Sequence, residues 1–201
     1  MLLIGLTGPS GAGKSRVAEI FAYFGLPVLN ADEIYHQLLS PPSHCLNELV
    51  DHFGNTILTS AGTLNRRVLA DIVFSDPASL STLNTISHRY VMEEVSRRME
   101  QMRREGIRAA VLDAPQLFEA GANRLCGAVV SVLADKNLRL ERILQRDGIE
   151  RDAALRRISA QKSDEFFRTH SNYIIENNYH TPEHLIPEVR RILTETGVLH
   201  P

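Results

Sequence analysis

The eight residues from Gly8 to Ser15, Gly-Pro-Ser-Gly-Ala-Gly-Lys-Ser, have types and spacing that could bind a phosphate chain. The three glycines let the backbone adopt positive φ angles, so successive N–H groups can point at the oxygens of an anion. Lys14 can reach the β- and γ-phosphates of a nucleoside triphosphate, and the Ser15 hydroxyl can bind a magnesium ion that bridges them. This pattern is a P-loop, and it predicts a nucleotide-binding site.

A strand and a helix must position this loop. The apolar run from Leu2 to Leu6 predicts a buried strand, and the apolar residues between Val17 and Phe21 recur at helical spacing. The loop therefore leads into a helix N-terminus, whose partial positive charge favours phosphate. The alternative, a glycine-rich turn that binds nothing, is disfavoured by the Lys-Ser pair between these flanks.

A carboxylate, Asp32, follows the second predicted strand, residues 26–30. In open α/β sheets ligands bind beyond the C-terminal ends of the strands, so Asp32 is expected at the same rim as the P-loop. There it could accept the proton of an attacking hydroxyl. An equally weighted alternative is that Asp32 only caps the helix that begins at Glu33.

Other polar residues are expected near the nucleotide. Asp113 ends an apolar strand and resembles the Walker B aspartate, which holds magnesium through water. Arg139, Arg142 and Arg146 are spaced by three and four residues, so they project from one side of a helix that could close over a triphosphate. A solvent-facing charge stripe is the alternative. Asn177 lies at the end of the last predicted strand, 172–178, on the nucleotide side.

Composition narrows the class of protein. The chain has 201 residues, 43% of them hydrophobic and 23% charged, as in ordinary globular proteins. Its formal net charge of -2 argues against nucleic acid as a main partner. Cys45 and Cys126 are far apart and lack metal-ligand spacing, which indicates reduced thiols in a cytoplasmic protein. The apolar N-terminus lacks the features of a signal peptide, and no stretch predicts a membrane helix.

The order of elements predicts a three-layer α/β fold, in which a five-stranded, mostly parallel sheet that carries the P-loop lies between helical layers. We expect residues 1–32, 108–135 and 172–201 to form the nucleotide-binding core, with a fourth strand over 126–133 and a terminal helix capped by Thr181-Pro182-Glu183. Residues 33–107 predict a helical acceptor-binding domain and 136–171 a helical lid. Within the helical domain, Arg66 could face substrate phosphates or solvent, and His88 by itself favours a structural role.

Further short motifs occur along the chain in a fixed order. They are Gly5-Leu6-Thr7-Gly8, Ala31-Asp32, Gly62-Thr63-Leu64 with Arg66-Arg67, Leu83-Asn84 with His88, Pro115 with Leu117-Phe118-Glu119, Arg142 with Arg146-Asp147, Arg157-Ile158 with Gln161, and Ile175 with Asn177. In this order and with these gaps, residues 2–190 resemble the dephospho-coenzyme A kinases.

The resemblance implies phosphorylation of the ribose 3'-hydroxyl of dephospho-CoA by ATP with Mg²⁺, in a cytoplasmic protein that we expect to be a monomer. The residues it implies for catalysis are Asp32 as the base, with Lys14, Arg142 and Arg146. Those expected to bind ATP are Gly8, Pro9, Ser10, Gly11, Ala12, Gly13, Lys14, Ser15, Arg142, Arg146 and Asn177. Those expected to bind the acceptor are Asp32, Arg66, His88, Pro115, Leu117 and Phe118. Ser15 and Asp113 are the expected metal ligands.

The chain departs from the family pattern at Asn30, Arg89, Gln116 and Asn172, where an aspartate, a proline, a leucine and an aspartate are usual. Three other functions stay open, and these departures bear on the third. One is a different P-loop small-molecule or nucleoside monophosphate kinase. Another is a nucleotide-dependent switch, although the chain has no Asn-Lys-x-Asp motif to read guanine. The third is a catalytically silent relative that binds only CoA or ATP.

Overall fold

The structure is a computed structural model, and it describes residues 1–179, 181 and 183–199. The chain forms two compact units. The first consists of Met1–Leu29 with Gly106–Pro201, and the second, the helical unit, is Asn30–Glu105. The predicted limits of the acceptor-binding domain lie within three residues of this division, and the predicted lid, 136–171, belongs to the first unit.

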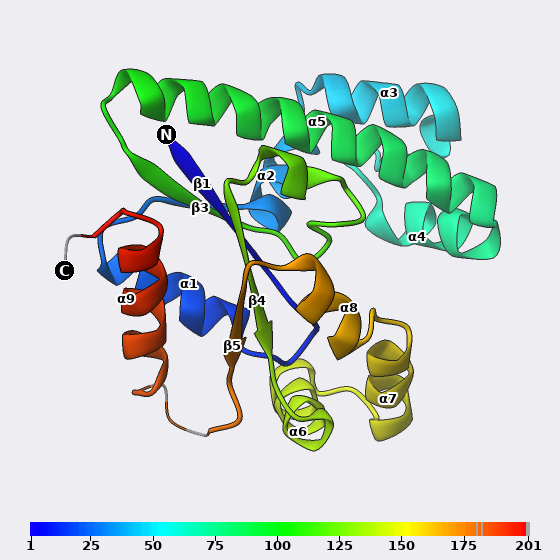
Figure 1. The fold of residues 1–201 in the computed structure, drawn as a ribbon. Coiled ribbons are helices and arrows are strands. Elements are labelled where there is room, and N and C mark those ends of the chain that lie inside the picture. Colours follow the sequence, from blue (N-terminus) through cyan, green and yellow to red (C-terminus); the bar gives the residue numbers. More distant parts are fainter. Residues whose placement is uncertain (180, 182, 200–201) are drawn as a thin grey trace. The chain divides into compact units, whose positions relative to one another are not determined.

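A parallel sheet forms the centre of the first unit, with strand order β2-β3-β1-β4-β5 (Figure 1). The strands are β1 (Leu2–Thr7), β2 (Val28–Asn30), β3 (Ala109–Asp113), β4 (Ala128–Leu133) and β5 (Tyr173–Glu176). β1 pairs in parallel with β3 and β4, and β4 pairs in parallel with β5. Every residue of β3 and β4 is buried, as expected for a sheet covered on both faces.

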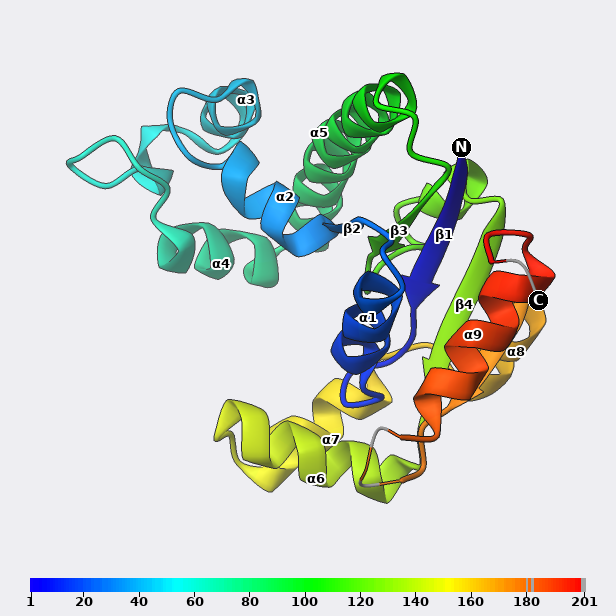
Figure 2. The ribbon, with the colours of Figure 1, turned by 90° about the vertical axis from the view of Figure 1, so that its left-hand side faces the viewer.

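Helices cover both faces of this sheet. The helices of the first unit are α1 (Lys14–Tyr23), α6 (Lys136–Asp147), α7 (Arg151–Ser159), α8 (Asp164–His170) and α9 (Leu185–Glu195), with a short 3-10 turn, η2 (Ala122–Leu125). α1 and α9 pack together on one face, where Ile4, Phe21, Val130, Ile175 and Val189 share a core. α8 contacts β4 and β5 from the opposite side (Figures 1 and 2). The predicted three-layer α/β fold is confirmed.

The predicted element limits differ in places from the observed ones. The second and fourth strands begin two residues later than predicted, at Val28 and Ala128. The terminal helix begins at Leu185, not at the predicted cap, and Pro182 of that cap lies outside the described residues. Gly148 ends α6 in a left-handed conformation, so the helical stretch 136–171 is divided there. Packing and capping decide where a helix or strand begins and ends, so a residue pattern predicts these limits only approximately.

The second unit is helical, as the sequence predicts. Its elements are α2 (Ala31–Leu38), α3 (His44–Phe53), η1 (Asn55–Ile57), α4 (Arg66–Ser75) and the long α5 (Pro77–Arg104), which Figure 2 shows together. α5 packs against α2, α3 and α4 around a core that includes Leu49, Ile57, Val73 and Ile86. Asn65 caps α4, since its side chain accepts a hydrogen bond from the Val68 N–H group. The acceptor-binding role of this unit stays a prediction.

Candidate active site

The P-loop connects β1 to α1 within the first unit. Gly8, Gly11 and Gly13 all have positive φ angles, of 135°, 78° and 96°. Gly13 is the N-cap of α1, so the loop ends at the helix N-terminus that the sequence predicts. The backbone therefore has the curled form that allows its N–H groups to surround an anion.

Two arginines of α6 hold the carbonyl groups of this loop. Nε of Arg139 donates to the Ser10 carbonyl at 3.0 Å, and Nη1 of Arg142 donates to the carbonyls of Gly11 and Ala12, each at 3.3 Å. Because a trans peptide is planar, the N–H group of the same peptide points away from its carbonyl. The amides of Gly11 and Gly13, which follow the Ser10 and Ala12 carbonyls, therefore face away from α6, whereas the Ala12 N–H group donates to the Pro9 carbonyl. That face of the loop is the one on which phosphate oxygens can be bound.

Asn177, which follows β5, completes the support behind the loop. Its side-chain nitrogen donates to the Ala12 carbonyl at 2.8 Å, and the residue is only 4% exposed. The second terminal nitrogen of Arg142 donates to the carbonyls of Asn177 and Tyr179, at 3.1 and 2.8 Å. The structure thus brings together the P-loop, Arg142 and Asn177. Here Arg142 and Asn177 act on the loop backbone, and their direct contact with ATP stays a prediction.

Lys14 and Ser15 occupy the first turn of α1. Nζ of Lys14 donates to the Gly8 carbonyl at 2.9 Å, so the ammonium group lies over the loop. Ser15 is exposed. Asp113, at the end of β3, is buried and pairs in register with Leu6, one residue before β1 ends. Ser15 thus lies in the helix that follows β1, and Asp113 ends the neighbouring strand β3. Their role as metal ligands stays a prediction.

Arg146, the third arginine of the predicted lid surface, lies beside Asp147. It donates to the Asp147 carboxylate at 2.7 Å and approaches the Ser10 hydroxyl at 3.4 Å. Arg157 of α7 also pairs with Asp147. Hydrogen bonds from Arg146, and then from Arg157, lower the pKa of Asp147 to about 2, although desolvation opposes them. Asp147 is therefore ionised at neutral pH and holds the two arginines of the α6–α7 pair.

Asp32 lies in the first turn of α2 and is exposed. The cap of this helix is Asn30, whose side-chain oxygen accepts hydrogen bonds from the N–H groups of Asp32 and Glu33 at 2.9 and 3.1 Å. The alternative that Asp32 serves only as the helix cap is therefore wrong. Since Asn30 performs that task, the Asp32 carboxylate is available for chemistry.

The same contacts explain the departure at position 30. Asn and Asp are about equally good N-caps, because both supply a side-chain oxygen. We expect Asn30→Asp to change the free energy of unfolding by no more than a few tenths of a kcal/mol, whereas Asn30→Ala should lower it by about 1 kcal/mol. Chemical denaturation of the two variants measures this difference. Equal stability of the two variants would show that the cap contributes nothing.

The other acceptor-site candidates fall in both units. In the helical unit, Arg66 lies in α4 with its guanidinium 3.0 Å from the His36 ring nitrogen, and His88 is half-buried in α5. Arg89, where the family usually has proline, pairs with Glu48 and lies over the Tyr90 ring. Arginine supplies the backbone N–H group that proline lacks, so the change is compatible with a continuous α5.

Pro115, Leu117 and Phe118 lie in the first unit, in the turn after β3. Pro115 is exposed, but Leu117 is fully buried, which argues against direct contact between its side chain and a substrate. Phe118 packs edge-on against Phe166 of α8, with ring centroids 5.3 Å apart.

The two remaining departures from the family pattern, at positions 116 and 172, also lie in the first unit. Gln116 is exposed. Asn172 accepts a hydrogen bond from the Val129 N–H group at 2.8 Å, which an aspartate could do equally well.

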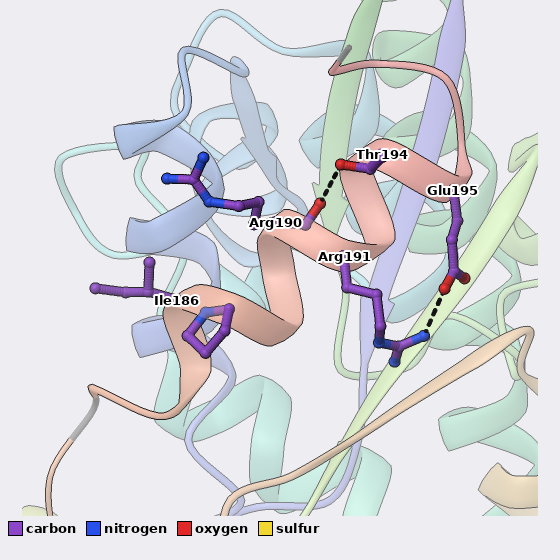
Figure 3. Close-up of a pocket in the computed structure, with 6 residues that line it drawn as sticks. Ile186, Arg190, Arg191, Thr194 and Glu195 are labelled. Atoms are coloured by element: carbon purple, nitrogen blue, oxygen red, sulfur yellow. Dashed lines mark hydrogen bonds and ion pairs between the residues drawn. The ribbon is translucent and has the colours of Figure 1, made fainter. Parts of the chain in front are cut away.

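A pocket on α9 is lined by residues of that helix alone, Ile186, Pro187, Arg190, Arg191, Thr194 and Glu195 (Figure 3). Arg191 pairs with Glu195 at 3.0 Å, and the Thr194 hydroxyl donates to the Arg190 carbonyl. None of the predicted site residues lines this pocket. This pocket is therefore separate from the predicted nucleotide site.

Comparisons with known proteins identify the family of the chain. A family model described as dephospho-CoA kinase matches residues 2–183. The chain is 38% identical over 178 residues to the dephospho-CoA kinase of Syntrophotalea carbinolica, covering 89% of this chain and 84% of that one. It is 37% identical over 195 residues to that of Corynebacterium efficiens, covering 97% of each.

Solved structures show the same relationship. A Thermus thermophilus protein has a TM-score of 0.79 at 31% identity, covering 96% of this chain and 97% of that one. Dephospho-CoA kinase from Campylobacter jejuni has a TM-score of 0.71 at 26% identity, covering 96% of each chain. A shikimate kinase from Bacteroides thetaiotaomicron, at 15% identity and a TM-score of 0.54 over 98% of this chain and 99% of that one, shares the fold. With the family model matching most of its length, the chain belongs to the dephospho-CoA kinase family.

Proposed function

We propose that this chain transfers the γ-phosphoryl group of ATP to the ribose 3'-hydroxyl of dephospho-CoA through the residues described above. The observation that carries the proposal is the P-loop, whose carbonyls are held by Arg139, Arg142 and Asn177 in a chain of the dephospho-CoA kinase family. Phosphoryl transfer needs positioning and charge stabilisation more than covalent chemistry. A rigid loop of backbone donors supplies both.

In this proposal the first unit binds ATP. The N–H groups on the open side of the loop bind the phosphates, and Lys14 neutralises charge on the transferred group. Arg146 is positioned to add a further positive charge, because it lies within 3.4 Å of the Ser10 hydroxyl on the loop. The loop donors are already oriented by α6 and Asn177, so little reorganisation accompanies the reaction.

The metal ligands are part of the proposal. Ser15 and Asp113 offer a hydroxyl and a carboxylate, and hard oxygen donors of this kind suit Mg²⁺. Among the residues that the structure describes, no group of three or more His, Cys, Asp or Glu side chains could hold a metal ion. This fits a magnesium ion that takes most of its ligands from phosphates and water. When bound, the ion would neutralise charge on the phosphate oxygens.

Asp32 is the proposed general base. Its carboxylate would accept the proton of the acceptor hydroxyl as the oxygen attacks the γ-phosphorus, and ADP would leave. Arg66 and His88 of the helical unit, with Pro115 and Phe118 of the first unit, are the proposed acceptor contacts. The acceptor phosphates give Arg66 a natural partner, because a guanidinium binds phosphate with two parallel hydrogen bonds.

Acceptor profiling tests the proposed function. ADP release would be measured with ATP and magnesium, using dephospho-CoA, adenosine, AMP, CMP or shikimate as the acceptor, and products would be identified by mass. We expect turnover with dephospho-CoA alone and the addition of one phosphate. Turnover with a different acceptor would mean a different small-molecule kinase. Nucleotide binding without turnover on any acceptor would mean a binding protein.

We also propose that the protein is a cytoplasmic monomer. In the described parts of the chain, no helix has the length and apolarity needed to cross a bilayer. The formal net charge of -2 disfavours binding to an anionic partner such as nucleic acid. Light scattering after size exclusion, and fractionation of the cells that produce the protein, test the two statements separately.

A further inference from the structure

Side chains bind both backbone polar groups of Ser10, its N–H group and its carbonyl. Its N–H group donates to Oε1 of Gln161 at 3.2 Å, and its carbonyl accepts from Nε of Arg139 at 3.0 Å. Gln161 lies between α7 and α8, 151 positions along the chain from Ser10. The P-loop is thus tied to both the start and the end of the α6–α7 pair.

Arg139 also fixes the orientation of Gln161. Nη2 of Arg139 donates to the same Oε1 atom at 2.7 Å, so this oxygen accepts two hydrogen bonds. A side-chain nitrogen could not occupy this position, because it would face two donors. The three hydrogen bonds close a ring through Ser10, Gln161 and Arg139, which defines the position of the Ser10 backbone.

Arg139 is a buried arginine. The residue is only 5% exposed, and its burial lowers the pKa of the guanidinium, with Asp164 at 3.7 Å acting in the opposite direction. The guanidinium stays protonated, because arginine does not lose its proton in proteins. Its donors are directed at Ser10 and Gln161, which suits it to supporting the loop from behind.

On this basis, and resting on the proposed function, we propose that Gln161 is a positioning residue for the ATP site. It acts through the Ser10 peptide and is itself held by Arg139. Because the Ser10 amide is bound to Gln161 and the Ala12 amide to the Pro9 carbonyl, the remaining amides of the loop must supply the phosphate contacts. The direction in which these N–H groups point depends on the position of the Ser10 peptide.

The test compares Gln161→Met with Gln145→Met, the same change at an exposed glutamine of α6. Methionine keeps the length of glutamine but lacks a strong acceptor, so Gln161→Met leaves the Ser10 N–H group and one arginine donor without a partner. Calorimetry with a non-hydrolysable imido analogue of ATP should show binding about tenfold weaker for Gln161→Met. Gln145→Met should bind as the unsubstituted protein does.

Kinetics give a second readout that a purely structural role would not move. We expect Gln161→Met to raise the KM for ATP by about the same factor, with kcat and the KM for dephospho-CoA nearly unchanged. If Gln161→Met melts at a lower temperature but binds the analogue normally, the residue only packs the lid and the proposal is wrong.

A third variant keeps the proposal testable if Gln161→Met does not fold. Gln161→Glu retains the acceptor oxygens beside the positive charge of Arg139, so it should bind the analogue more tightly than Gln161→Met, or fold where Gln161→Met does not. Binding by Gln161→Glu as weak as by Gln161→Met, or failure of both variants to fold, would overturn the positioning role. Absence of binding by the unsubstituted protein would instead overturn the proposed function, and this inference with it.

Discussion

Asp32→Asn should lower kcat by about two orders of magnitude or more while ATP binding stays nearly unchanged, because general-base catalysis contributes about 10²- to 10⁴-fold. The substitution keeps the shape of the side chain but removes the group that accepts the proton. The Asn30 cap accepts from the backbone N–H of residue 32, which the substitution leaves in place, so α2 should be retained. Steady-state kinetics with dephospho-CoA and calorimetry with the ATP analogue measure the two effects.

Glu33→Gln is the matched control for this experiment. Glu33 is the next residue in α2, is also exposed, and donates its N–H group to the same Asn30 oxygen. Removing either carboxylate changes the charge at the helix N-terminus in the same way. Only Asp32→Asn should lose turnover. Full activity of that variant would remove Asp32 from the mechanism, and a rise in the KM for dephospho-CoA with normal kcat would make Asp32 a binding residue instead.

Gly13→Ala should weaken ATP binding strongly and also lower the free energy of unfolding. Gly13 has a φ angle of 96°, and a Cβ atom there would lie 2.2 Å from Nδ2 of Asn177. That nitrogen donates to the Ala12 carbonyl, so relief of the clash must displace the support of the loop. The left-handed conformation costs a non-glycine residue about 1–2 kcal/mol. The overpacking adds about 1–3 kcal/mol.

Gly25→Ala separates the two contributions. Gly25 follows the other end of α1 with a φ angle of 85°, and nothing lies within 4 Å of the position its Cβ would take. This variant should therefore show the backbone strain without the clash, and it should bind ATP normally. Urea denaturation and calorimetry of both variants provide the comparison. Equal losses of stability in the two variants would mean that Asn177 moves aside at no cost.

The limits of what the sequence shows are clear at Asp32 and His88. Residue spacing places Asp32 after a strand, but a strand-to-helix turn can carry either a base or a cap there. The alternatives were separated by one observation, that the Asn30 side chain occupies the backbone donors of the cap. For His88, neither the spacing nor the position in α5 assigns a role, because a half-buried histidine on a helix suits several.

What the sequence by itself determined was the P-loop, the α/β fold, the helical insertion and the family. These follow from local patterns, since loop glycines, the Lys-Ser pair and apolar periodicity act over a few neighbouring residues. Only the tertiary structure decided which distant side chains hold the loop. Arg139, Arg142, Gln161 and Asn177 reach it from more than 120 positions away. Such contacts depend on how the strands and helices pack, and no local spacing encodes them. The same holds for Leu117, whose burial arises from packing and makes an expected contact residue part of the core.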